Sequence, residues 1–227
     1  MTSPASLIDR LKRDDERIVV ELGHRVRDER LTHPLTGLPL GEPLCWARAP
    51  SSQACAAVVR ACREHGVRVV PLASGTAFWD PVEVAGAVVL DTLAIDRVVT
   101  VDRERRLVVA GAGARVGDVD RAARREGLCL PAYPDAGSDT PVATILSVGS
   151  TAGMGAARLL PVEQVSGACV VTGDGALVHA GTAFAFSGRP FLREGRPSLL
   201  GLISGAQGHA GIITEVGLLL EPALPLA

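Results

Sequence analysis

Apolar residues recur along the chain with two spacings, and each spacing predicts a different kind of element. Between residues 5 and 30 they recur every four and seven positions in a charged segment, which predicts one amphipathic helix. After Pro50 a second helix is predicted, capped by Ser51 or Ser52 and ended by Gly66. The apolar face of this second helix consists of Ala54, Val58, Ala61 and Cys62.

Short apolar runs bounded by turn residues predict β-strands. In chain order these runs are 67–71, 87–90, 98–101, 107–110, 167–172, 176–180 and 211–220. Residues 116–126 predict a third helix, and the Gly173-Asp174-Gly175 turn joins two of the later strands as a hairpin. The second helix and the first two strands together form a βαβ-like unit.

The pattern divides the chain into four parts. They are an N-terminal helical extension (1–45), a first subdomain (46–97), a second subdomain (98–222) and a short tail (223–227). The first subdomain contains the βαβ-like unit, and the second contains the hairpins and the third helix.

Composition narrows the class of protein. The chain has 227 residues of which 47% are apolar, enough for a sizeable core. No apolar run reaches the roughly 18 residues of a membrane span, and the charged N-terminus favours a cytoplasmic location. A net charge of −2 without a basic stripe argues against a nucleic-acid partner. The cysteines are odd in number and lack C-x-x-C spacing, which favours reduced thiols over disulfides or a metal site: Cys45, Cys55, Cys62, Cys129 and Cys169.

Three segments rich in small residues are candidates for binding a ligand. Leu72–Ala77 follows a strand, where consecutive backbone N–H groups can form an anion site for phosphate, although a plain turn is the simpler reading. Thr144–Gly155 permits close approach of backbone to a flat ligand, and its alternative is an irregular buried loop. Gly205–Thr214 suits a backbone packed against another wall, and its alternative is a helix-to-strand turn.

The order and spacing of these segments resemble the FAD-binding domains of vanillyl-alcohol-oxidase-type flavoenzymes, and are most similar to those of cytokinin dehydrogenases and sugar-lactone oxidases. The resemblance covers about residues 46–222. Its matching segments are Leu72–Ala77, the turn at 110–113, Val142–Gly155, the hairpin at 170–178 and Gly205–Thr214. It implies an α+β fold of the PCMH type, with a small βαβ-containing subdomain and a larger mixed or antiparallel sheet flanked by helices.

The resemblance also implies where FAD lies. The cofactor would sit between the two subdomains, with the pyrophosphate over 72–77, the isoalloxazine along 140–155 and the adenine near 205–214. The residues implied to bind it are Leu72, Ala73, Ser74, Gly75, Thr76, Ala77, Val142, Ala143, Thr144, Ser147, Gly153, Gly155, Gly211 and Ile213.

Four residues depart from the family pattern. Ala73 and Ser74 stand where the family has glycine or the flavin-linking histidine, so the FAD is expected to be noncovalent. Ala143 and Thr144 replace paired glycines. Because a non-glycine residue at positive φ costs roughly 1–2 kcal/mol, we expect these replacements to weaken or abolish FAD binding.

The family continues beyond the point that matches Glu221–Pro222 into a substrate domain, whereas this chain stops at Ala227. The resemblance therefore implies that a substrate face comes from a partner chain or a second copy, from residues 1–45, or from direct access to the flavin. A small-molecule substrate is the other expected partner.

His209 and Asp139 are the candidate catalytic residues, because His209 lies in the glycine-rich segment Gly205–Thr214, where the family has glutamine, and Asp139 lies just before the small-residue stretch. Histidine titrates near neutral pH and suits proton transfer, although a lone loop histidine is more often structural. Further cleft candidates without a spacing that demands catalysis are Tyr133, Asp135, Trp79 and Asp80. A hydrolase stays open, because a Ser/His/Asp triad is defined by geometry rather than order.

Three functions follow as hypotheses. The first is an FAD-dependent oxidoreductase, or its FAD-binding subunit, in which noncovalent flavin accepts a hydride from a small organic substrate. The second is a flavin-independent descendant that catalyses a non-redox step, such as a cyclisation in natural-product biosynthesis. The third is a non-catalytic partner of a full-length flavoenzyme.

Overall fold

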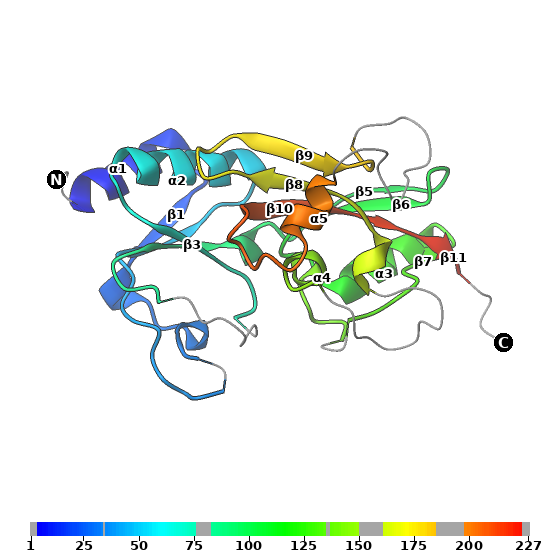
Figure 1. The fold of residues 1–227 in the computed structure, drawn as a ribbon, viewed down its shortest axis with the longest axis horizontal. Helices are drawn as coiled ribbons and strands as arrows, with labels where there is room; N and C mark the ends of the chain where they lie inside the picture. The colour runs from blue at the N-terminus through cyan, green and yellow to red at the C-terminus, as the bar shows by residue number, and fades with distance from the viewer. Residues whose placement is uncertain are drawn as a thin grey trace. The chain divides into compact units, whose positions relative to one another are not determined.

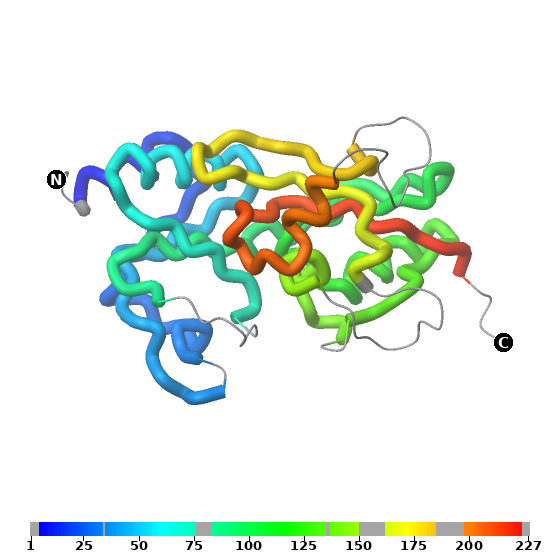
Figure 2. The backbone as a smooth tube through the Cα atoms, viewed as in Figure 1, coloured from blue at the N-terminus to red at the C-terminus, as the bar shows by residue number. Residues whose placement is uncertain are grey.

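The computed structural model describes residues 4–33, 35–75, 83–134, 137–149, 161–184 and 198–223. The chain divides into two compact units, Met1–Ile95 with Val171–Leu177, and Asp96–Val170 with Val178–Ala227 (Figures 1 and 2). Each unit has its own sheet and its own apolar core.

A four-stranded sheet of order β1-β2-β4-β3 organises the first unit (Figure 1). Its strands are β1 (Val19–Leu22), β2 (Cys45–Arg48), β3 (Val69–Leu72) and β4 (Val88–Asp91). Both β2 and β3 run parallel to the central β4, and β1 is antiparallel to β2. All four residues of β4 are buried, as expected for a strand with neighbours on both sides. The predicted strands at 67–71 and 87–90 are thus confirmed, with ends shifted by one or two residues.

Helix α2 (Ser52–Glu64) connects β2 to β3, so the observed βαβ unit includes β2, whereas the predicted βαβ-like unit consisted of the helix and the strands at 67–71 and 87–90. The hydroxyl of Ser51 accepts a hydrogen bond from the N–H of Ala54 at 3.2 Å, so Ser51 is the N-cap. The predicted apolar face is buried, and the helix ends at Glu64, two residues before Gly66.

The predicted single helix over 5–30 is wrong. Helix α1 (Pro4–Asp14) ends before Asp15, whose side chain accepts a hydrogen bond from the N–H of Arg17. Aspartate that bonds to its own backbone in this way favours a turn over a helix. The β-branched run that follows joins the sheet as β1 through pairing with β2, and two short 3₁₀ helices, η1 (Gly23–Arg25) and η2 (Glu29–Leu31), complete the segment.

The second unit is built on a five-stranded sheet of order β5-β6-β10-β8-β9. Its strands are β5 (Val98–Asp102), β6 (Leu107–Gly111), β8 (Val165–Val171), β9 (Leu177–Gly181) and β10 (Ile212–Leu219). Helix α3 (Val116–Arg125) buries Val116, Val119 and Ala123 in the core of this unit. All five strands and the helix correspond to predicted elements.

Several short elements were not predicted. They are α4 (Val142–Ser147), α5 (Leu199–Ile203), β2, the pair β7 (Leu128–Cys129) and β11 (Glu221–Pro222), and the 3₁₀ helices η3 (Thr92–Ala94) and η4 (Pro161–Gln164). Helix α4 has six residues, which is less than two turns, so its sequence cannot show a helical period.

All five cysteines are free. Cys129 is half-buried, and the other four are buried: Cys45, Cys55, Cys62 and Cys169. Burial raises the pKa of the Cys45 thiol to about 11. None of the helices in the described ranges has both the length and the apolarity to cross a membrane.

Candidate functional site

The first candidate site is the loop that leaves the end of β3, residues 72–75, which we call the cofactor loop. Its residues are half-buried. The carbonyl of Leu72 accepts a hydrogen bond from Thr92 Oγ1 at 3.2 Å, and the carbonyl of Ala73 accepts one from Arg30 Nη1 at 2.9 Å. Gly75 has φ +70°, and a Cβ at this position would lie 3.0 Å from the Cβ of Arg30. A larger residue at Gly75 would therefore meet both backbone strain and a steric clash.

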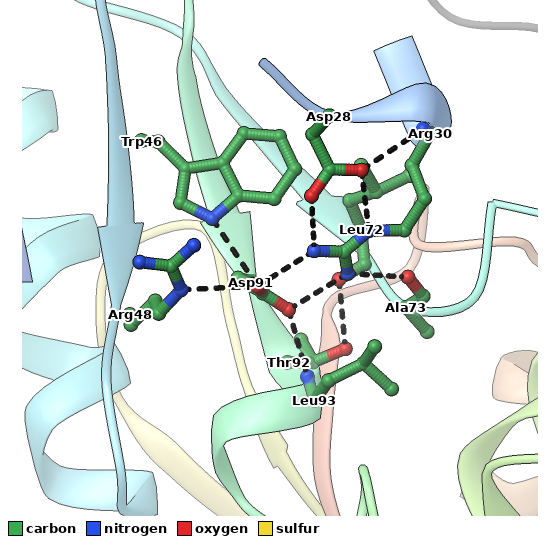
Figure 3. Close-up of polar contacts among 9 residues, drawn as sticks. All are labelled: Asp28, Arg30, Trp46, Arg48, Leu72, Ala73, Asp91, Thr92 and Leu93. Atoms are coloured by element: carbon green, nitrogen blue, oxygen red, sulfur yellow. Dashed lines mark hydrogen bonds and ion pairs between the residues drawn. The ribbon is translucent and has the colours of Figure 1, made fainter. Parts of the chain in front are cut away.

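A charged cluster anchors this loop (Figure 3). Arg30 makes two hydrogen bonds to Asp91, at 3.1 and 3.0 Å, and two to Asp28, at 2.9 and 2.8 Å. The indole Nε1 of Trp46 donates to Asp91 at 3.2 Å, and the guanidinium carbon of Arg30 lies 4.8 Å from the centre of the Trp46 ring. Arg48 Nε reaches the same carboxylate at 3.6 Å from a more exposed position.

Asp91 is the centre of this cluster, because it is the most buried of the charged groups at 3% exposure. It is the last residue of β4 and also accepts a hydrogen bond from the N–H of Leu93, which caps the 3₁₀ helix η3. Hydrogen bonding to Arg30 lowers the pKa of Asp28. Burial alone would lower the pKa of Arg30, but its bonds to Asp28 and Asp91 outweigh burial and raise it.

The second candidate site lies in the other unit, where three predicted segments meet through backbone hydrogen bonds. Ala112 donates to the carbonyl of Thr214 at 2.9 Å, and Ala143 donates to the carbonyl of Ala112 at 3.1 Å. Gly205 donates to Leu146 and Gln207 to Ser147, each at 3.0 Å. Figure 2 traces α4 and the segment after α5 side by side. The turn at 110–113, the segment from 142 and the segment from 205 thus form one wall of small residues.

The residues predicted to bind the cofactor are distributed over these two sites. Leu72, Ala73, Ser74 and Gly75 form the cofactor loop. In the wall, Val142, Ala143 and Ile213 are buried, whereas Thr144, Ser147 and Gly211 are half-buried. The others fall outside the described residues: Thr76, Ala77, Gly153 and Gly155, together with Trp79, Asp80 and Asp135.

The expected backbone strain at the four departures from the family pattern is wrong. Within the described ranges the non-glycine residues at positive φ are Arg106 and Gln207. Ala143 and Thr144 lie inside helix α4, where a β-carbon is accommodated without strain. In the cofactor loop the positive φ falls on Gly75 rather than on Ala73 or Ser74. The glycine replacements therefore carry no backbone penalty in this fold.

The two candidate catalytic residues lie in exposed positions of the second unit. His209 is in the turn before β10, where its N–H donates to the carbonyl of Ala206 at 2.8 Å. Asp139 precedes α4 and makes an ion pair with Arg115 at 3.1 Å, its side chain 83% exposed. Their roles as acid or base stay predictions.

Tyr133, a further cleft candidate, has an unusual titration. Burial raises its pKa, and a hydrogen bond with Asp120 raises it further. Asp120 is itself buried and also accepts hydrogen bonds from Leu130 N and Arg124 Nε, at 2.8 and 2.6 Å. Its charge disfavours a tyrosinate beside it.

Since Tyr133 is the only tyrosine, its titration can be read directly from tyrosinate absorbance. The folded pKa is raised above the unfolded value of about 10. The contribution to stability is therefore full below about pH 10 and is lost as pH rises through the folded pKa. We expect ionisation at higher pH in the native protein than in urea, and an intermediate value in D120N. Coincident native and unfolded curves would contradict the contact with Asp120.

Sequence reasoning missed Arg30, Asp28 and Asp91. Asp91 carried a weak signal, because a carboxylate directly after a buried strand is unusual. Nothing in the sequence pairs it with an arginine 61 positions away.

The cofactor loop fits a phosphate group. Two of its carbonyl oxygens are held by protein donors, and it contains no side chain larger than leucine. Backbone N–H groups of such a loop suit an anion. The small-residue wall of the second unit likewise allows backbone to approach a flat ligand.

The sequence and the fold of this chain are similar to those of known proteins. The family model described as "FAD binding domain" matches residues 43–181. A D-lactate dehydrogenase of Anaerostipes hadrus is 27% identical over 188 residues, covering 80% of this chain and 37% of that protein. An uncharacterized FAD-linked oxidoreductase of Mycobacterium tuberculosis is 28% identical over 193 residues, covering 84% of this chain and 40% of that protein. The chain thus spans about two fifths of these relatives.

Among solved structures, p-cresol methylhydroxylase with substrate bound superposes with a TM-score of 0.76 at 18% identity. The match covers 98% of this chain and 44% of that chain. At this identity the likeness shows the fold, and it confirms the predicted α+β, PCMH-type architecture.

Proposed function

We propose that this chain, which belongs to the FAD binding domain family, holds FAD noncovalently and serves as the cofactor-binding part of an oxidoreductase. The observation that carries the proposal is the family match over residues 43–181, which includes the cofactor loop and α4. FAD is the cofactor that this family and the FAD-linked relative indicate. Bound FAD supplies an acceptor for the hydride of a small organic substrate.

The chain's own residues have two roles in this proposal. The main-chain N–H groups of the cofactor loop bind the pyrophosphate, and Gly75 gives the loop its turn. The wall around α4 borders the flavin and keeps water from it, because its buried residues are apolar. A histidyl, cysteinyl or tyrosyl bond to the flavin is not available at residues 71–77, because this segment contains none of these residues.

For the substrate we propose a small 2-hydroxy acid. The support is the D-lactate dehydrogenase of Anaerostipes hadrus, whose match covers 80% of this chain. The rest of a substrate site would come from a partner chain, a second copy or a further part of the protein.

The experiment is an absorption spectrum of the purified protein, followed by FAD titration if it is colourless. We expect flavin bands, and we expect anaerobic D-lactate to bleach them more than L-lactate does. No binding at any FAD concentration tested would refute the cofactor. Bound flavin that dithionite reduces but no hydroxy acid bleaches, in the presence of the chain or further part that completes the substrate site, would refute the substrate class alone. Bound flavin that no reductant bleaches would favour a non-redox or partner role.

A further inference from the structure

We propose that Arg30 is a positioning residue for FAD: its guanidinium holds the cofactor loop so that successive main-chain N–H groups face the pyrophosphate. This inference rests on the FAD-binding function proposed above. Arg30 precedes residues 43–181, the part of the chain that the family model matches. The family match therefore assigns it no role.

Every donor of the Arg30 guanidinium is already used. Nε donates to Asp28, Nη1 donates to Asp91 and to the carbonyl of Ala73, and Nη2 donates to Asp28 and Asp91 (Figure 3). A guanidinium has five N–H donors, and these contacts account for all of them. Arg30 thus cannot bind phosphate without giving up a protein partner, and its effect on FAD must pass through the loop.

The contact with the Ala73 carbonyl fixes the direction of the next N–H group. In a trans peptide the C=O of one residue and the N–H of the next point in opposite directions, and the described chain has no cis peptide. Because Arg30 binds the carbonyl of Ala73, the N–H of Ser74 points away from Arg30. Because Thr92 binds the carbonyl of Leu72, the N–H of Ala73 points away from Thr92. The N–H groups of Ala73 and Ser74 are thus turned away from the residues that hold the two carbonyls, an orientation in which a loop can present N–H groups to an anion.

Packing makes this arrangement specific to arginine. The loop rests on the Arg30 stem, since a Cβ at Gly75 would lie 3.0 Å from both Cβ and Cγ of Arg30. The guanidinium carbon lies 4.8 Å from the centre of the Trp46 ring, the guanidinium pairs with two carboxylates, and the Arg30 side chain is only 15% exposed. Lysine has three donors around one nitrogen, so it cannot pair with both carboxylates in this bidentate way and still reach the Ala73 carbonyl.

Arg48 provides the matched control. It lies within 3.6 Å of the same carboxylate, carries the same charge, and makes no hydrogen bond to the cofactor loop among the described contacts. R48K makes the same arginine-to-lysine change beside the same carboxylate without removing a contact of the cofactor loop.

The experiment compares the wild-type protein, R30K, R48K and T92V by FAD titration, followed by flavin fluorescence. We expect R30K to weaken FAD binding about tenfold or more, because a charged hydrogen bond to the loop is lost. R48K should stay within about twofold of wild type. Equal affinity in R30K and wild type would overturn the proposal, and so would an equal loss in R30K and R48K.

A second readout separates positioning from stability. In ¹⁵N-labelled protein, inorganic pyrophosphate should shift the amide signals of Ala73, Ser74 and Gly75 in wild type and R48K, and much less in R30K. Unchanged shifts in a folded R30K would overturn the proposal. If R30K does not fold, the same pyrophosphate titration is carried out on T92V, since this variant lacks the hydroxyl that donates to the Leu72 carbonyl. An unchanged pyrophosphate response in T92V would then overturn the role of the held carbonyls.

Different experimental results would refute the proposed function and the role of Arg30. If the wild-type protein binds no FAD, the proposed function is refuted, and only the amide shifts caused by pyrophosphate test the positioning role of Arg30. If wild type binds FAD and R30K binds it equally well, the function stands and the role of Arg30 is refuted.

Discussion

Replacing Asp91 by alanine is expected to lower the free energy of unfolding by about 3 kcal/mol or more, because it removes one partner of a buried charged cluster. The Asp91 side chain is 5% exposed and receives hydrogen bonds from Arg30, Trp46 and the N–H of Leu93. Without it the Trp46 indole N–H and the start of η3 lose their acceptor in a site that water does not reach easily. Arg30 keeps Asp28, which holds the loss toward the lower end of the range for buried pairs.

Urea unfolding followed by the fluorescence of Trp46 measures this loss. The chain has two tryptophans, so a W79F background makes Trp46 the sole reporter of the first unit. E64A is the matched control, since Glu64 pairs with Arg10 at 3.5 Å in the same unit and its side chain is 55% exposed. It should cost less than about 1 kcal/mol. Similar losses in D91A and E64A would show that the cluster around Asp91 adds nothing beyond a surface ion pair.

The contrast between Asp91 and α2 shows what the sequence can predict. Helix α2 was predictable because its signals are local: the Ser51 cap, the apolar period and the glycine after its end lie within 16 residues. The strands β4 and β10 were predictable because buried runs bounded by turns admit few other readings. Arg30 and Asp91 are joined only by the tertiary fold, and no local pattern in either segment indicates the other.

The prediction of one helix over residues 5–30 was wrong for a related reason. Residues 5–30 have helical spacing throughout, yet Asp15 begins a turn and the β-branched residues after it complete a sheet edge. The pairing partner of that edge, β2, comes more than twenty residues later. Spacing alone could not show that a strand position was available there.

At the candidate site, the residues that replace family glycines were expected to strain the backbone and do not. Family patterns suggested that Ala143 and Thr144 would strain the backbone, but the segment is helical and accepts β-carbons. The loop keeps glycine at Gly75, the position where positive φ and a close neighbour coincide. The family pattern thus did not predict the backbone conformation at these residues.

Replacing Gly181 by alanine should destabilise the second unit by about 3 kcal/mol, because two penalties fall on one residue. Gly181 ends β9 with φ +80°, a region that costs an L-residue roughly 1–2 kcal/mol. A Cβ there would also lie 2.8 Å from the Cα of Gly167 and closer still to the carbonyl oxygen of Ser166. Both neighbours belong to β8, so the strand itself would have to shift, at a typical cost of about 1–3 kcal/mol.

Gly127 separates these two penalties. It lies in the same unit with φ +72°, and nothing lies within 4 Å of where its Cβ would be. G127A should therefore cost only the conformational term of about 1–2 kcal/mol. Guanidinium unfolding followed by circular dichroism compares the two variants with wild type. If G181A cost no more than G127A, the close approach of β9 to β8 at Ser166 and Gly167 would be incorrect.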